Sequence, residues 1–148
     1  MAKSSGSTRT TVSGAPSVEQ AQSQVDKLST TWMKSSVIRT EDVFNKSTSD
    51  EIRKKAEQTV EERGGFGNFG HIKDTESIET VSISNLYPTQ DMVSSNTVKN
   101  LIASIKEEGM KEMPTAVRMD GKVYVLNGHH RVIAAKLMKE KNIKLRIL

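Results

Sequence analysis

The chain has 148 residues, carries a net charge of +4 and contains no cysteine, which excludes disulfides, thiolate metal sites and thiol nucleophiles. Only 34% of the residues are hydrophobic, so we expect one compact domain with a polar arm, because chains that fold throughout are nearly half apolar. No apolar run approaches the ~20 residues that span a bilayer, and the first residues lack the apolar core of a signal peptide. We therefore expect no membrane contact and a cytoplasmic protein.

The first half of the chain predicts a tail followed by a helical extension. Residues 1–15 are rich in Ser, Thr and Gly and predict a disordered tail. Ser17 and Gln20 have the spacing of a capping box that opens a helix, and the apolar residues after it follow one stripe from Val18 to Trp32. We expect this stripe to dock either on the rest of the chain or on a protein partner.

A second helix completes the extension, which we place at residues 16–63. Thr48 or Ser49 caps this helix, and its few apolar residues predict that most of its surface is solvated. Residues 37–44, between the two helices, fit a strand or a loop.

A glycine-rich segment, residues 64–76, separates the extension from the C-terminal half. It contains four glycines, but no strand precedes it and no helix follows it, as a phosphate-binding loop would require. We interpret the segment as a flexible linker that leads into a domain of residues 77–148.

The domain of residues 77–148 has the pattern of an α+β fold. Ser94 or Ser95 caps a helix that Gly109 ends in the left-handed conformation, and Asp120-Gly121 turns a hairpin. We expect a small mixed sheet of about four strands with two packed helices. Its segments are a strand at 78–83, a proline loop at 85–90, the capped helix, a hairpin at 114–126, a helix from His129 to about Glu140 and a strand at 143–147.

The junction between the hairpin and the last helix is the strongest candidate for a functional site. A buried strand pattern ends at Asn127, Gly128 makes the turn, and the helix begins with His129, His130 and Arg131. Such a turn presents free backbone N–H groups and the positive end of the helix dipole. The two histidines and the fixed positive charge add donors, so the junction predicts an anion site, most often one for phosphate.

These residues also carry a resemblance to the ParB/sulfiredoxin superfamily and its ParB-like nuclease domain. The shared parts are a strand, a proline loop, a helix ending in Gly, a strand pair and Gly-x-x-Arg-x-x-Ala. Here they are Val81-Ser82-Ile83, Leu86-Tyr87-Pro88-Thr89-Gln90, Val98 to Gly109, Pro114 to Arg118 and Gly128 to Ala135. The resemblance implies that a nucleotide or nucleic-acid phosphate is bound by Thr89, Gln90, Asn127, Gly128, His129, His130 and Arg131.

Two differences from the family patterns affect the expected chemistry. The Gly-Glu-Arg-Arg motif of partition proteins is replaced by Gly128-His129-His130-Arg131, and the cysteine of sulfiredoxins is replaced by His129. The resemblance therefore implies no sulfinic-acid reductase chemistry, and it leaves ATP, ADP and CTP open as nucleotides, with Mg²⁺ as a companion ion. Gly-His-His-Arg resembles the branch of free-serine kinases and phage-borne domains, which implies a bacterial host or a phage or mobile element.

The site residues also have structural alternatives. Arg131 opposes the helix dipole and needs a counter-anion, which is either a phosphate or the carboxylate of Glu112 or Asp91. His129 and His130 point about 100° apart on a helix, so we expect donors rather than metal ligands. With ordinary pKa values of about 6.5, the two histidines would strengthen anion binding as the pH falls.

Asp91 is the one acid of the proline loop and the candidate catalytic residue, as a general base or a metal-bound carboxylate. Its alternative is an ordinary Asx turn.

Three functions follow from these patterns. The first is a nucleotide-binding ParB-like domain, with or without hydrolase or phosphotransfer activity. The second is a metal-dependent nuclease acting on DNA, and the third is a non-enzymatic phage or mobile-element adaptor.

Overall fold

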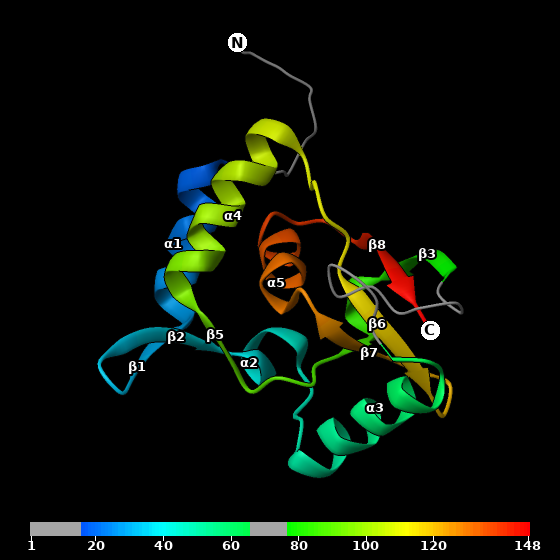
Figure 1. Cartoon of the computed structure of the whole chain (residues 1–148). Coiled ribbons are helices and arrows are strands. Elements are labelled where there is room, and N and C mark those ends of the chain that lie inside the picture. Colours follow the sequence, from blue (N-terminus) through cyan, green and yellow to red (C-terminus); the bar gives the residue numbers. More distant parts are fainter. Residues whose placement is uncertain (1–15, 66–76) are drawn as a thin grey trace.

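The computed structural model describes residues 16–65 and 77–148, which form two β-sheets with helices packed around them (Figure 1). In chain order the elements are α1 (Val18–Leu28), β1 (Ser29–Trp32), β2 (Ser35–Arg39), α2 (Thr40–Phe44), α3 (Asp50–Glu62), β3 (Ser77–Ser82), the 3-10 helix η2 (Ile83–Asn85), β4 (Leu86–Tyr87), β5 (Met92–Ser94), α4 (Ser95–Glu108), β6 (Thr115–Met119), β7 (Lys122–Asn127), α5 (His129–Leu137) and β8 (Asn142–Ile147). The expected tail and most of the expected linker lie outside the described residues.

The larger sheet confirms the expected α+β fold. Its five strands lie in the order β3-β8-β6-β7-β4. The pairs β3 with β8 and β6 with β7 are antiparallel, whereas β6 with β8 and β4 with β7 are parallel, so the sheet is mixed. One strand was missed from the sequence: Leu86 and Tyr87, expected in the proline loop, form β4 and pair with Val123 and Tyr124 of β7.

Helices cover both faces of this sheet. On one face lies α5, and α4 packs on α5 from outside, with Ile102 and Ile133 completely buried in the main core. On the other face lies α3, in a smaller apolar cluster made of Ala56, Val60, Val117, Met119 and Leu148. Complete burial of a side chain such as Ile133 contributes about 1.5–3 kcal/mol, so the sheet holds α5 firmly and fixes the turn that precedes it.

The N-terminal extension, expected to be helical with a strand or a loop at residues 37–44, contains strands as well as helices. α1 packs on α4, and its residues Ala21 and Val25 are buried in the main core. β1 and β2 form a second antiparallel sheet with β5, in the order β1-β2-β5. Residues 37–44 are the end of β2 and all of α2. The boundary expected within residues 64–76 stays a prediction, because most of that segment lies outside the described residues.

The helix with the apolar stripe ends earlier than expected. α1 stops at Leu28, and Trp32 lies in β1 with 55% of its surface exposed. The Ser29 hydroxyl donates to the Val25 carbonyl at 2.6 Å and lies 2.7 Å from the Ser95 hydroxyl, so the end of α1 contacts the start of α4. The periodicity of the sequence could not show this, because Ser95 lies 66 residues away.

Local signals at helix ends and turns are confirmed with one correction. Ser49 caps α3 and Ser94 caps α4 through their hydroxyls. Asp120 and Gly121 have the positive φ angles, 53° and 78°, of a two-residue hairpin turn. Gly109 ends α4 with φ 77° and ψ 177°, so its backbone is not in the left-handed helical conformation that the sequence predicted.

Candidate functional site

Gly128 turns the chain from β7 into α5 in the left-handed conformation, with φ 92° and ψ 27°. A Cβ at this position would lie 3.0 Å from the Cβ and 3.1 Å from the Cα of Pro114. The turn therefore requires glycine for two reasons, its backbone angle and the close approach of Pro114. At the start of α5 it leaves backbone N–H groups that have no partner within the helix, at the positive end of the helix dipole.

Beside this turn lies a cleft of about 380 Å³, which we call the Gly128 cleft. Its lining comes from the loop before β6, from the ends of β6 and β7, from the first turn of α5 and from β8. The residues are Lys111, Glu112, Met113, Thr115, Asn127, Gly128, Arg131 and Arg146. Three of these side chains are cationic and one is acidic, so the cleft has an excess of positive charge.

The guanidinium of Arg131 pairs with the carboxylate of Glu112 at 2.9 Å. Of the two carboxylates expected as alternatives, the structure therefore brings Glu112 to Arg131, whereas Asp91 pairs with Arg53. The Glu112 side chain is 74% exposed, and the Arg131 side chain is 29% exposed. Exposed pairs typically contribute about 0–1 kcal/mol, so the carboxylate holds the guanidinium weakly.

His129 does not line the Gly128 cleft, because it is almost completely buried. Its Nε2 accepts a hydrogen bond from the backbone N–H of Thr89 at 3.0 Å, and the ring of Phe44 lies 6.1 Å from its own, centroid to centroid. Because Nε2 accepts, the neutral ring carries its proton on Nδ1. Burial, with a smaller contribution from His130, lowers the pKa of His129 to about 4.

His130 has a similar role one residue later. Its Nε2 accepts from the backbone N–H of Ser94 at 3.2 Å. Burial, and then the positive charge of Arg131, lowers its pKa as well. The prediction that both histidines have ordinary pKa values is therefore wrong. With lowered pKa values, the two rings give no reason to expect stronger anion binding as the pH falls. Both rings are neutral acceptors that fasten the segment from Thr89 to Ser94 onto α5.

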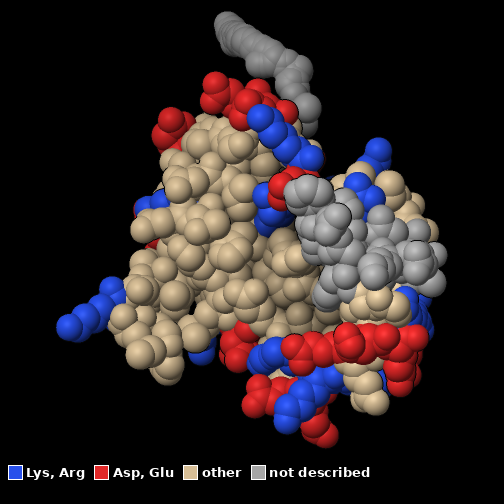
Figure 2. Space-filling model, viewed as in Figure 1, with Lys and Arg blue, Asp and Glu red and all other residues tan. Residues whose placement is uncertain are grey.

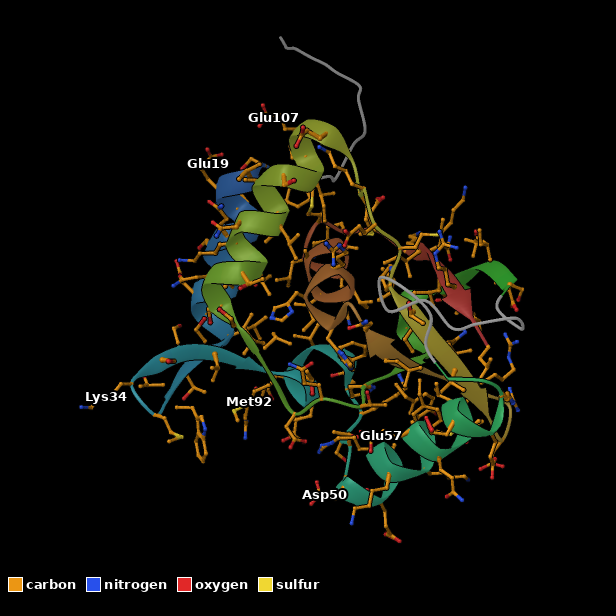
Figure 3. All side chains as sticks on the ribbon, viewed as in Figure 1. Glu19, Lys34, Asp50, Glu57, Met92 and Glu107 are labelled. Atoms are coloured by element: carbon orange, nitrogen blue, oxygen red, sulfur yellow. The ribbon has the colours of Figure 1, made fainter. Side chains whose placement is uncertain are left out.

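The proline-loop residues Thr89, Gln90 and Asp91 line a different cleft, of about 490 Å³, which we call the α3 cleft. Its other lining residues come from α3, β5 and β7, and they are Arg53, Ala56, Glu57, Val60, Met92 and Leu126. Glu57 and Met92 are labelled in Figure 3. The hydroxyl of Thr89 is directed inward and donates to the carbonyl of Val125 at 2.7 Å. The structure thus separates the proline loop from Asn127, Gly128 and Arg131, with His129 as the connection.

Asp91 has an exposed carboxylate with a cation beside it. Its side chain is 62% exposed and lies 3.6 Å from the guanidinium of Arg53, which also contacts Asp50 at 3.1 Å. Its backbone carbonyl accepts hydrogen bonds from the N–H and the hydroxyl of Thr40. The main chain at Asp91 thus anchors the start of α2, and the catalytic role of its side chain stays a prediction.

Two cations of the Gly128 cleft were not identified as site residues from the sequence. Lys111 lies in the loop before β6, and Arg146 lies in β8, which alternates buried and more exposed residues. The parallel pairing of β6 with β8 places Arg146 opposite Thr115, and the Arg146 N–H donates to the carbonyl of Pro114 at 3.0 Å. The alternation of buried and exposed residues predicts that the Arg146 side chain lies on the side of β8 away from the core. Its position beside the Gly128 turn follows only from the order of the strands.

Two findings concern residues 16–65 and 77–148 alone. They contain no group of three or more His, Cys, Asp and Glu side chains that could hold a metal ion. They also contain no helix long and apolar enough to cross a membrane.

The sequence matches one family model. Residues 69–148, more than half of the chain, match the ParB N-terminal domain. This range contains β3 to β8 with α4 and α5, and hence every residue that lines the Gly128 cleft. No curated protein matches the sequence.

Three solved structures are similar over about half of this chain. Sulfiredoxin from Arabidopsis thaliana is 23% identical with a TM-score of 0.42, over 49% of this chain and 84% of its own. The C-terminally truncated chromosome-partitioning protein ParB from Caulobacter crescentus, complexed with CTP-gamma-S, is 16% identical with a TM-score of 0.44, over 49% and 44%. A conserved hypothetical protein from Pyrococcus furiosus is 17% identical with a TM-score of 0.46, over 53% and 34%. The chain thus spans less than half the length of the last two.

Proposed function

The chain belongs to the ParB N-terminal domain family, and we propose that its Gly128 cleft binds the phosphate groups of a nucleotide. The observation that carries this proposal is the convergence of three cations, Lys111, Arg131 and Arg146, on a glycine turn that begins a helix. Free N–H groups, the helix dipole and guanidinium groups all favour an anion with several oxygen atoms. Phosphate has that chemistry.

The ion pair of Arg131 with Glu112 is compatible with this function. A carboxylate carries one charge, and the loop that holds Glu112 leaves its side chain 74% exposed. A phosphate of a nucleotide carries more charge and can accept two parallel hydrogen bonds from one guanidinium. We therefore expect phosphate to displace Glu112 from Arg131, so that Glu112 acts as a weak competitor.

His129 and His130 position the site and do not contact the anion in this proposal. Their Nε2 atoms already accept backbone hydrogen bonds, so neither presents a donor at that atom. By fastening the segment from Thr89 to Ser94 onto α5, they fix the first turn of the helix, which carries Arg131. The ligand-binding roles of Thr89 and Gln90 and the catalytic role of Asp91 remain predictions, and all three residues line the α3 cleft.

Calorimetric titration of the full chain with CTP, ATP and ADP, with and without Mg²⁺, tests the proposal. Loss of a charge-assisted contact typically costs about 1.5–3 kcal/mol, so Arg131→Ala should weaken nucleotide binding by about 10- to 100-fold. Arg53→Ala is the matched control, because it removes an arginine from the α3 cleft. Equal weakening by both variants, or unchanged binding in Arg131→Ala, would contradict the proposal. Turnover is a separate question, for which Asp91→Asn must stop hydrolysis while binding survives.

A further inference from the structure

The β1–β2 hairpin exposes large apolar side chains at one end of the molecule. Of the three large hydrophobic residues that the structure shows as exposed, Trp32 and Met33 lie side by side at the tip of this hairpin, 55% and 83% exposed. Figure 3 shows the labelled Lys34, at the same tip, far from α5 and the sheet it covers. The hairpin therefore presents the only tryptophan of the chain away from both clefts.

The outer edge of β1 has unpaired backbone groups and no charged side chain. β1 is the edge strand of the sheet β1-β2-β5, and no other strand in the described part of the chain pairs with it. Its sequence is Ser29-Thr30-Thr31-Trp32, and Lys34 is the one charged residue between Lys27 and Arg39. In Figure 2 the hairpin surface turned to the viewer is uncharged apart from a basic side chain that projects from its tip. Edge strands that must stay single usually carry lysine, proline or a bulge.

The edge strand β3 of the larger sheet differs in this respect. It carries Glu79, whose carboxylate accepts two hydrogen bonds from Arg118, at 2.9 and 3.2 Å. A charged side chain on an edge strand, such as Glu79, disfavours the approach of another strand, because the charge would lose water. The two edges therefore give a comparison within one chain, in which β3 is protected by charge and β1 is not.

We propose that β1 pairs antiparallel with β1 of a second copy of this chain, which joins two three-stranded sheets into one sheet of six strands. An interface across a two-fold axis places each residue near its own counterpart, so a charged strand would repel itself. Each chain carries a net charge of +4, and β1 is a neutral segment where two such chains can approach.

The geometry of β1 sets the register of this pairing. Side chains directly opposite each other in antiparallel strands lie on the same face, so the axis must pass through a pair of identical residues, either Thr30 with Thr30 or Thr31 with Thr31. Both threonines are exposed, and threonine pairs across strands are favourable. Trp32 of each copy then lies beside the other copy's β1. Because so short a strand buries little area, we expect a weak dimer with a dissociation constant of about 1–100 µM.

Sedimentation equilibrium of the full chain over a range of concentrations tests this proposal. We expect a monomer–dimer equilibrium, and Thr31→Lys should weaken it by at least about tenfold, because in either register it places a lysine of each copy next to the two-fold axis. Thr80→Lys, the same change on the exposed face of edge strand β3, should leave the equilibrium unchanged. The melting temperatures of both variants show whether each still folds.

The fluorescence of Trp32 gives an independent measurement on the unmodified chain. Its emission should move to shorter wavelength as the concentration rises, with the same midpoint as the change in mass, because dimerisation removes its ring from water. A monomer at every concentration with constant emission would overturn the proposal and leave β1 free for a strand of another protein. Equal loss of the dimer in Thr31→Lys and Thr80→Lys would overturn it too.

Discussion

The Gly128 cleft and the α3 cleft are lined by neighbouring residues at the end of β7, but the charges of their lining side chains differ. Leu126 lines the α3 cleft and Asn127 lines the Gly128 cleft. In the α3 cleft, Arg53 lies between the carboxylates of Asp50 and Asp91, and Figure 2 shows acidic and basic side chains intermixed over α3. The Gly128 cleft is lined by three cations and one acid, with a second acid, Glu108, 3.1 Å from Lys111 outside the lining. The larger cleft is therefore the less suitable one for an anion, because charge balance and the helix N-terminus matter more than volume.

The largest expected effect on stability comes from replacing Gly128, the glycine of the turn between the two clefts. Gly128→Val should destabilise the protein by about 3 kcal/mol, since a left-handed β-branched residue costs about 1–2 kcal/mol and crowding about 1–3 kcal/mol. The crowded group is Pro114, only 3.0 Å from the added Cβ. Urea denaturation measures the loss. A loss below about 1 kcal/mol would show that the turn tolerates a side chain and would remove the structural reason for this glycine.

The next effect concerns the histidine that connects the two clefts. The pKa of His129 is about 4 in the folded state, below its ordinary value of 6.5. Between these pH values the unfolded state binds more protons, so stability is fully present above about pH 6.5 and is lost as the pH falls toward about 4. From pH 6.5 to pH 5 the free energy of unfolding should fall by roughly 2 kcal/mol.

The variant His129→Gln tests the assignment of this pH dependence. It should be less stable at neutral pH, because the hydrogen bond from the Thr89 N–H is lost or lengthened, but most of its pH dependence should disappear. A smaller slope should remain from His130, whose pKa is also lowered. Urea denaturation at several pH values measures both quantities. An unchanged slope in the variant would contradict the account of a buried, neutral His129.

A smaller effect sharpens the charge difference between the clefts. Glu112→Gln removes the one acid that lines the Gly128 cleft and should strengthen nucleotide binding by up to about fivefold, since the pair it forms with Arg131 is worth about 0–1 kcal/mol. Asp91→Asn removes an acid of similar exposure from the α3 cleft and is the matched control. We expect its nucleotide affinity to change less than about twofold. Calorimetry measures the nucleotide affinity of both variants. Tighter binding in the control alone would assign the anion to the α3 cleft.

The helices and strands that the sequence predicted well are marked by local patterns, such as caps and alternation, that lie within the element or a few residues from it. The caps Ser49 and Ser94 start α3 and α4 as the patterns indicated, and alternation marked β8. The β1–β2 hairpin was missed because its turn residues Met33 and Lys34 adopt φ angles of 49° and 67°. Asn and Gly are the usual residues of such turns, so this one leaves no local signal.

The candidate site divides in the same way. Gly128 and Arg131 follow from a strand, a turn and a helix that are adjacent in sequence. The burial of His129 depends on a backbone N–H 40 residues away, and the position of Arg146 depends on the order of the strands. Neither feature can be read from a single segment. Local sequence patterns therefore identify the glycine turn at Gly128, but they do not identify the neutral histidines or the additional cations.

An NMR titration of the isotopically labelled chain with CTP, ATP or ADP tests the central claim most directly, because backbone amide shifts report where the nucleotide binds. We expect the largest shifts at the amides of Gly128 to Arg131 and of Lys111 to Met113, around the cations of the Gly128 cleft. Shifts confined to Arg53 to Val60 and Thr89 to Met92 would place the ligand in the α3 cleft and contradict the account. The absence of shifts with all three nucleotides would contradict nucleotide binding itself.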